Sequence, residues 1–123
     1  MSLTQFVGKL FVPRQRALEK YQHEGEVLQR TVLSHLIETA GDTEFGRNHA
    51  FSSIKGYDDF ISQVPVNTYE ELKGDIDRMR HGEADILWPG KVKWYAKSSG
   101  TTNDKSKFIP VSPEGLQKIH YAG

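Results

Sequence analysis

The amino-acid sequence predicts an α+β fold that is mostly helical and carries a short β hairpin near its carboxyl end. Over the first 82 residues, apolar side chains recur at three- and four-residue intervals, which is the period of an amphipathic helix. Two short apolar runs, 92–97 and 108–111, then flank a polar segment, as the strands of a hairpin do. We therefore expect one unit, with helices over 1–82, the hairpin and its loop over 86–111, and the start of a further helix over 112–123.

Two helices are predicted before Gly41. A short amphipathic stripe opens the chain and ends at Pro13; it is formed by Leu3, Phe6, Val7, Leu10 and Phe11. From Arg14 to Ala40 the helical spacing resumes as one long amphipathic helix. Gly41 stands at the position where a glycine commonly ends a helix. The segment 45–48 is expected to be a loop.

Two shorter helices are predicted in the middle of the chain. The first covers Gly56–Gln63, and its buried side is expected to carry Tyr57, Phe60 and Ile61. A valine–proline step then interrupts the helical pattern, because the residue before proline avoids the helical region. Asn67 or Thr68 caps the second helix, which runs to about Arg80 and ends at Gly82.

Strands are predicted in the last third of the chain. Residues 86–88 form a short apolar run before a Pro-Gly pair, while 92–97 and 108–111 are the two strands of the hairpin. Ser112 followed by Pro113 is a typical helix start, with serine as the cap and proline in the first turn. Three strand aromatics are expected in the core rather than stacked on a nucleotide base: Trp88, Trp94 and Tyr95.

Composition excludes several classes of function. The chain has 123 residues, of which 16 are basic and 16 acidic, so no net charge attracts nucleic acid or an anionic membrane. It has no cysteine, which excludes disulfides, thiol nucleophiles and cysteine-bearing metal sites. No apolar run approaches the ~20 residues that cross a bilayer. We expect a cytoplasmic protein that binds neither nucleic acid nor membranes.

The sequence predicts no metal site. The histidines lack the i, i+4 spacing of zinc enzymes and are expected to be surface or half-buried; they are His23, His35, His49, His81 and His120. Paired carboxylates occur at helix starts or on solvated helix faces, where acidic residues are common.

The polar segment between the two hairpin strands, residues 98–107, has the chemistry of a triphosphate-binding loop. It combines hydroxyl side chains and two lysines with Gly100, where the backbone can approach a ligand closely. It is not the phosphate loop of P-loop NTPases, because the second glycine is missing and the spacing to Lys105 is one residue short. A simple surface turn is the alternative, but the polar run from Lys97 to Lys107 is longer than a usual hairpin loop.

The order of residues in this loop resembles a known superfamily. Ser98-Ser99-Gly100-Thr101-Thr102, followed by flexible residues and a lysine, is similar to the phosphate-binding loop of adenylate-forming enzymes. The longer form ending in Lys107-Phe108-Ile109-Pro110 resembles the auxin-responsive Gretchen Hagen family, the acyl-acid amido synthetases. Motifs upstream agree in the same order: Thr43-Glu44-Phe45-Gly46, Phe51, Tyr57-Asp58-Asp59-Phe60, Val64-Pro65-Val66, Tyr69-Glu70 and Ile86-Leu87-Trp88-Pro89-Gly90.

This resemblance implies an ATP-dependent ligase that adenylates a carboxylic acid and joins it to an amino acid. It assigns the β- and γ-phosphates of ATP to Ser98, Ser99, Gly100, Thr101, Thr102 and Lys107, whereas Lys105 lies where the family pattern varies. It implies Mg²⁺ as a further cofactor, with its carboxylate ligand outside this chain. No residue of the chain is assigned a covalent catalytic role.

Enzymes of the resembled family are several times longer than this chain, so we expect an N-terminal fragment of the large ATP-binding domain, truncated at Gly123. Such a fragment is expected to be inactive alone and to self-associate through uncovered apolar surface. Two alternatives stay open at this point. One is an acyl-CoA-type ligase of the same superfamily, and the other is a non-catalytic helical interaction domain whose loop is a surface turn.

Overall fold

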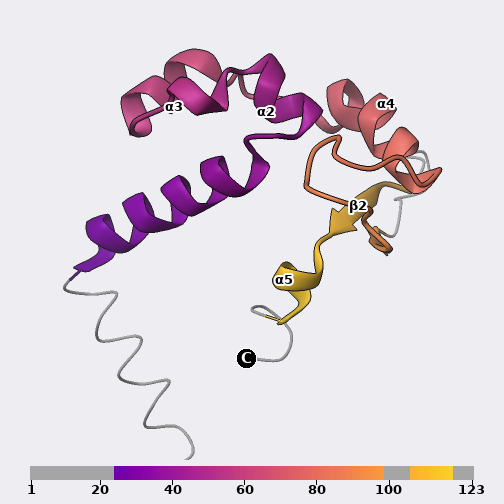
Figure 1. The fold of residues 1–123 in the computed structure, drawn as a ribbon. Helices are drawn as coiled ribbons and strands as arrows, with labels where there is room; N and C mark the ends of the chain where they lie inside the picture. Colours follow the sequence, from indigo (N-terminus) through magenta and orange to yellow (C-terminus); the bar gives the residue numbers. More distant parts are fainter. Residues whose placement is uncertain (1–23, 99–105, 118–123) are drawn as a thin grey trace, which may run out of the picture.

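The computed structural model describes residues 24–98 and 106–117, and Figure 1 shows how this part of the chain is arranged. It begins with a long helix over residues 24–40. The later elements are α2 (Glu44–Asn48), η1 (Phe51–Ser53), α3 (Tyr57–Gln63), α4 (Tyr69–Arg80), β1 (Trp94–Lys97), β2 (Phe108–Val111) and α5 (Pro113–Gly115). Helices together with a two-stranded antiparallel sheet confirm the predicted α+β class for the described residues.

The long helix ends at Ala40, as its apolar spacing predicts. Its last turn buries Ile37 and Ala40 against Phe51. Gly41 follows directly, but without the left-handed φ that a C′ glycine commonly adopts, which the described glycines show only at Gly82 and Gly90. The predicted N-terminal stripe and the first part of this helix, within residues 1–23, lie outside the described residues.

The loop predicted over 45–48 is wrong, because these residues form α2. Thr43 caps this helix: its Oγ1 accepts the Gly46 N–H at 3.0 Å and donates to the Ala40 carbonyl at 2.7 Å. The next two free N–H groups find carbonyls far along the chain, Glu44 with Asp85 at 2.7 Å and Phe45 with Ile86 at 3.0 Å. The first turn of a helix needs such acceptors, so α2 depends on a tertiary contact.

The strand predicted at 86–88 is also wrong, since this stretch bends instead of pairing. Asp85 has φ of 59° and Gly90 has φ of 70°, so the chain turns sharply at both ends of the segment. The Asp85 N–H donates to the Gly90 carbonyl at 3.2 Å, and the Gly90 N–H donates to Asp85 Oδ1 at 2.7 Å. The segment is thus a closed loop whose carbonyls cap α2 and whose apolar residues fill the core.

The described core consists of two small apolar clusters that share Trp88. One cluster centres on the buried residues Ile37, Ala40 and Phe51, and the other on Met79, Ile86 and Val92. Trp88 packs against both clusters, as expected for a core aromatic. It is the side chain that connects the long helix to the α4 half of the molecule.

The helix α3 has the predicted position but not the predicted burial. It covers Tyr57–Gln63 with Gly56 as its N-cap residue. Of the three apolar residues expected on its buried side, only Phe60 packs against the core, whereas Tyr57 is 64% and Ile61 55% exposed. A helix of two turns offers one inward position to the cluster beside it.

The helix α4 confirms the prediction most closely. Thr68 is its N-cap and forms a capping box with Glu71, whose carboxylate accepts the Thr68 N–H at 2.6 Å. These hydrogen bonds hold the pKa of Glu71 below its ordinary value. At the other end, Gly82 adopts φ of 92° and terminates the helix. Both boundaries follow from short-range signals that the sequence carries locally.

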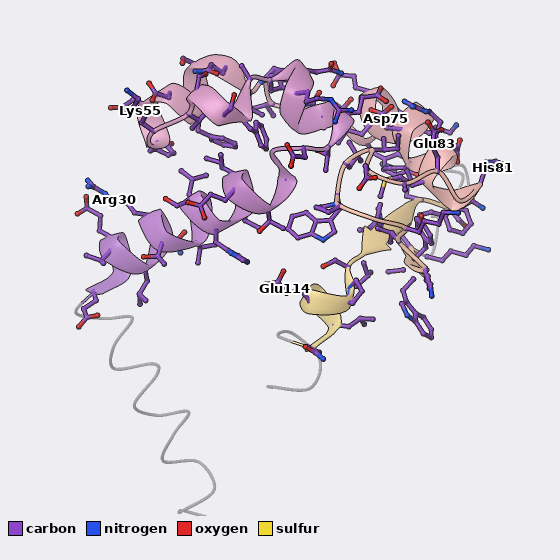
Figure 2. The ribbon with its side chains drawn as sticks, in the orientation of Figure 1. Arg30, Lys55, Asp75, His81, Glu83 and Glu114 are labelled. Carbon is purple, nitrogen blue, oxygen red and sulfur yellow. The ribbon has the colours of Figure 1, made fainter. Side chains whose placement is uncertain are left out.

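An ion-pair cluster around Arg78 joins α4 to α2. The Arg78 guanidinium donates to both carboxylate oxygens of Glu44, at 2.9 and 2.8 Å, and to both of Glu83, at 2.9 and 2.6 Å. Asp75 lies one turn earlier on α4, with its Oδ1 at 3.3 Å from the same group. Figure 2 labels Asp75 on α4 and Glu83 in the chain just after that helix. Bidentate geometry makes this pairing stronger than an ordinary surface ion pair.

Acidification is expected to destabilise the chain through this cluster. Hydrogen bonds from Arg78 hold the pKa values of Glu44 and Glu83 below the ordinary value of 4.5. The folded state therefore binds these two protons less tightly than the unfolded state does. The stabilisation is fully present above pH 4.5, the ordinary value, and is lost as the pH falls through the lower folded values. Urea unfolding between pH 7 and pH 3 measures the loss.

A matched pair of variants isolates the Arg78 contribution to this pH dependence. The double variant Glu44→Gln, Glu83→Gln removes both depressed carboxylates and should flatten the acid limb of the stability profile. Glu70→Gln removes an exposed carboxylate for which no described ion pair exists, and it should leave the profile unchanged. An equally steep acid limb in the double variant would show that other groups cause it.

The hairpin forms as predicted, with Trp94 opposite Val111 and Lys97 opposite Phe108. One of its faces exposes Trp94 (63%) and Ile109 (52%), so the expectation that Trp94 lies in the core is wrong. Tyr95, on the other face, is half-buried and packs against the Met79 cluster. A two-stranded hairpin has one side free unless something covers it. The predicted self-association would bury such a face, and it stays a prediction.

Within residues 24–98 and 106–117, no helix combines the length and the apolar character needed to cross a membrane. The C-terminal described element, α5, is capped by Ser112, whose hydroxyl accepts the Gly115 N–H at 3.0 Å as the sequence predicts. Its Glu114 carboxylate, labelled in Figure 2, lies 3.0 Å from Nε2 of His35 on the long helix.

Candidate functional site

The candidate site is the base of the loop between β1 and β2. The Ser98 N–H donates to the Lys107 carbonyl at 3.0 Å, and the Lys107 N–H donates to Ser98 Oγ at 3.1 Å. The first of these bonds extends the hairpin ladder by one residue pair beyond Lys97 and Phe108, and the second adds a side-chain bond at the same pair. Of the six predicted phosphate-binding residues, the structure describes Ser98 and Lys107 and brings them together. The other four, Ser99, Gly100, Thr101 and Thr102, lie outside the described residues.

Ser98 has a structural role in addition to the predicted one. Its N–H and one lone pair of its hydroxyl are used within the hairpin. A serine hydroxyl that accepts one hydrogen bond still carries its own proton for donation. Ser98 can therefore fix the width of the loop base and keep one donor for an anionic ligand.

Lys107 is half-buried, and its ammonium lies over an aromatic ring. The Lys107 Nζ is 5.4 Å from the centre of the Tyr69 ring, a cation–π distance. The Tyr69 hydroxyl also accepts the N–H of the next residue, Phe108, at 3.0 Å. The first residue of α4 thus contacts the end of the loop at two adjacent positions.

Two further cations lie at the loop base, around Phe108. The Arg80 guanidinium carbon is 3.7 Å from the centre of the Phe108 ring, and Lys97 Nζ is 6.0 Å from it. Tyr69 and Phe108 therefore form an aromatic platform for Arg80, Lys97 and Lys107. Sequence reasoning found Lys107 but missed the platform. The sequence shows only that Lys107 and Phe108 are neighbours. The fold then places Tyr69 and Arg80 of α4 against these two residues.

The charge balance at this platform favours an anion. Arg80 pairs with Asp77 at 3.1 Å on its own helix. For Lys97 and Lys107, by contrast, no carboxylate among the described residues forms an ion pair. Positive charge without a neutralising carboxylate among the described residues, beside the hydroxyl donor of Ser98, is an arrangement that favours phosphate oxygens.

The described histidines have structural partners elsewhere. His35 pairs with Glu114, His49 Nδ1 lies 2.9 Å from the Phe45 carbonyl, and His81 Nδ1 lies 2.7 Å from the Asp77 carbonyl. All three are exposed or half-buried, which confirms that prediction for them. No group of three histidine or acidic side chains among residues 24–98 and 106–117 is placed to hold a metal ion.

Comparison with known proteins shows the family to which the chain belongs. Residues 14–123 match the family model of the GH3 family N-terminal domain. The chain is similar to three Arabidopsis thaliana proteins: the probable indole-3-acetic acid-amido synthetase GH3.1 (28% identity over 104 residues, 84% of this chain and 18% of the relative), the indole-3-acetic acid-amido synthetase GH3.5 (28% over 102 residues, 82% and 17%) and the indole-3-acetic acid-amido synthetase GH3.15 (30% over 92 residues, 74% and 15%).

The chain spans less than a fifth of the length of these curated relatives, between 15% and 18% of each. The match nevertheless covers nearly all of the chain and includes the loop, both hairpin strands and α4. It confirms the resemblance that the ordered sequence motifs indicate. The chain therefore belongs to the GH3 family and carries the part that corresponds to its N-terminal domain.

Proposed function

We propose that this chain is the N-terminal part of an ATP-dependent acyl-acid amido synthetase and that it supplies the phosphate-binding loop of that enzyme. Family membership and the amido synthetase names of the relatives support the reaction class. The loop base supports the location, because it places Lys107 and Ser98 together beside positive charge that no described carboxylate neutralises. The charge of Lys97 and Lys107, which forms no ion pair with a carboxylate of residues 24–98 or 106–117, is the observation on which the proposal depends.

In the proposed site, Ser98, Ser99, Gly100, Thr101, Thr102 and Lys107 hold the β- and γ-phosphates of ATP. A carboxylate oxygen of the acyl acid attacks the α-phosphorus, and the bond from that phosphorus to the bridging oxygen of pyrophosphate breaks. The amine of an amino acid then attacks the acyl carbon, and AMP leaves as the amide forms. Negative charge grows on the departing pyrophosphate in the first step, so an ammonium fixed at the loop base stabilises that transition state.

The described residues do not fit a magnesium site, since no group of three acidic or histidine side chains among them is placed to hold a metal ion. We therefore assign no step of the reaction to Mg²⁺ in this chain, and we propose that its protein ligand lies elsewhere in the enzyme. The acyl and amine sites are likewise proposed to lie outside the chain, which is expected to be inactive alone. Cytoplasmic localisation is part of the same proposal.

Replacing Lys107 with alanine in the complete enzyme is expected to slow acid-dependent ATP–pyrophosphate exchange about a hundredfold, as the loss of one transition-state donor typically does. Indole-3-acetic acid, the acid in the relatives' names, is the first acid to use. The matched control is Lys93→Ala, which removes the same charge from an exposed position before β1. Exchange at the wild-type rate in Lys107→Ala would contradict the proposed role of the loop.

A further inference from the structure

Tyr69 holds the end of the loop by two separate interactions. Its hydroxyl accepts the Phe108 N–H at 3.0 Å, and its ring lies 5.4 Å below the Lys107 ammonium. Both contacts span nearly forty positions of sequence, with 39 separating Tyr69 and Phe108. One side chain therefore fixes the backbone just after the loop and the charge that the loop presents.

The geometry of the hairpin explains why the hydroxyl is needed. The Ser98 N–H donates to the Lys107 carbonyl, so Lys107 directs its backbone groups toward β1. In an antiparallel pair every second residue does the same, and in β2 these residues are Ile109 and Val111. Phe108 and Pro110 then face the outer edge, where no strand lies beside β2 among the described residues. Proline has no N–H, so Phe108 carries the outward N–H of this strand. Tyr69 supplies its acceptor where a neighbouring strand otherwise would.

Tyr69 is itself held firmly. It is the first residue of α4, directly after the Thr68 cap. The Glu71 carboxylate fixes that cap by accepting the Thr68 N–H at 2.6 Å and the Thr68 hydroxyl proton at 2.7 Å. Further along α4, Met79 is buried in the core and Arg80 stacks on the Phe108 ring at 3.7 Å. The start of β2 is thus attached to both ends of one capped helix.

We propose that Tyr69 is a positioning residue for the phosphate loop, which sets the place of the Lys107 ammonium and the direction of the chain as it leaves the loop. The inference rests on the proposed function of the loop. The ring face restricts the flexible lysine side chain and compensates its ammonium for lost hydration. The hydroxyl fixes the backbone from which that lysine extends. Tyr69 acts through Lys107 and is not itself a phosphate ligand.

The test is a mutant cycle on ATP affinity in the complete enzyme, measured as the KM for ATP in pyrophosphate exchange. Tyr69→Leu removes both contacts and should raise that KM about tenfold. Tyr69→Phe keeps the ring and should raise it less, about threefold. The matched control is Tyr57→Leu, since Tyr57 is the first residue of α3 and is 64% exposed. It should leave the KM unchanged.

The Lys107→Ala background separates positioning from general structural damage. If Tyr69 acts through Lys107, neither Tyr69 variant raises the KM for ATP further in that background. Losses that multiply would overturn the proposal, as would a KM for Tyr69→Leu equal to that of Tyr57→Leu. Should Tyr69→Leu fail to fold, the Tyr69→Phe arm of the cycle gives the same decision. If Lys107→Ala by itself leaves exchange unchanged, the proposed phosphate-binding role of the loop is wrong. If Lys107→Ala slows exchange but the Tyr69 variants leave the KM for ATP unchanged, only the positioning role of Tyr69 is wrong.

Discussion

Replacing Gly46 with alanine is expected to destabilise the chain by about 3 kcal/mol, the upper part of the range for overpacked sites. Gly46 is buried in α2, where an added Cβ would lie 2.1 Å from the Ala40 carbonyl oxygen and 2.8 Å from that of Gly41. These are backbone atoms at the end of the long helix, so relief requires α2 to move away from it. That movement would also pull the Gly46 N–H from the Thr43 hydroxyl.

Gly74→Ala is the matched control for this substitution. Gly74 also lies inside a helix, α4, but an added Cβ there meets nothing within 4 Å. Alanine is the better helix former by about 1 kcal/mol, so this variant should be more stable than the wild type. Urea unfolding followed by circular dichroism measures both changes. Opposite signs are expected, and a Gly46→Ala variant as stable as the wild type would show that α2 does not pack against the long helix as described.

Replacing Met79 with alanine is expected to cost about 2–5 kcal/mol, the range for truncating a buried large side chain. Met79 is 2% exposed and forms a cluster with Ile86 and Val92. Ile86 belongs to the segment whose Asp85 and Ile86 carbonyls cap α2, and Val92 follows that segment. A cavity at Met79 would therefore loosen the segment that satisfies the first turn of α2, as well as removing apolar contacts.

Val66→Ala serves as the control for Met79→Ala, because Val66 is 99% exposed in the extended step before α4. Its free energy of unfolding should stay within about 0.5 kcal/mol of the wild type. Amide hydrogen exchange at Glu44 and Phe45 reports on the α2 cap directly. Faster exchange of these two amides in Met79→Ala, but not in Val66→Ala, is the expected result. Unchanged exchange would mean that the cap does not depend on the Met79 cluster.

The sequence predicts those elements whose boundaries are set by nearby residues. Thr68 with Glu71 and the terminating Gly82 define α4, and alternation around the polar loop defines both hairpin strands. In contrast, α2 is capped by carbonyls some forty residues downstream, so no local pattern identifies it beyond Thr43 itself. The apolar run 86–88 resembles a strand because burial and strand pairing demand the same residues. Only the positive φ of Asp85 and Gly90 decides between them.

The residues of the candidate site likewise fall into two groups, those that the local sequence predicts and those that it does not. Ser98 and Lys107 could be assigned from the order of residues in the loop, and their pairing follows once the two strands align. Tyr69 and Arg80 could not be assigned, since their contacts with Lys107 and Phe108 arise from how α4 lies along β2. Trp94 was misjudged for a related reason. A hairpin this short has one face without a partner in the described chain, and residue type does not say which face that is.

The outward edge of β2 has a consequence for how this sheet is able to grow. Pro110 has no backbone donor to offer, and the one on Phe108 is already engaged by a phenol. An incoming strand would find no donor to bind along that border, whereas β1 presents Tyr95 and Lys97 outward on its far side. Only carbonyl acceptors remain on the β2 border, so we expect a third strand to pair more readily beside β1.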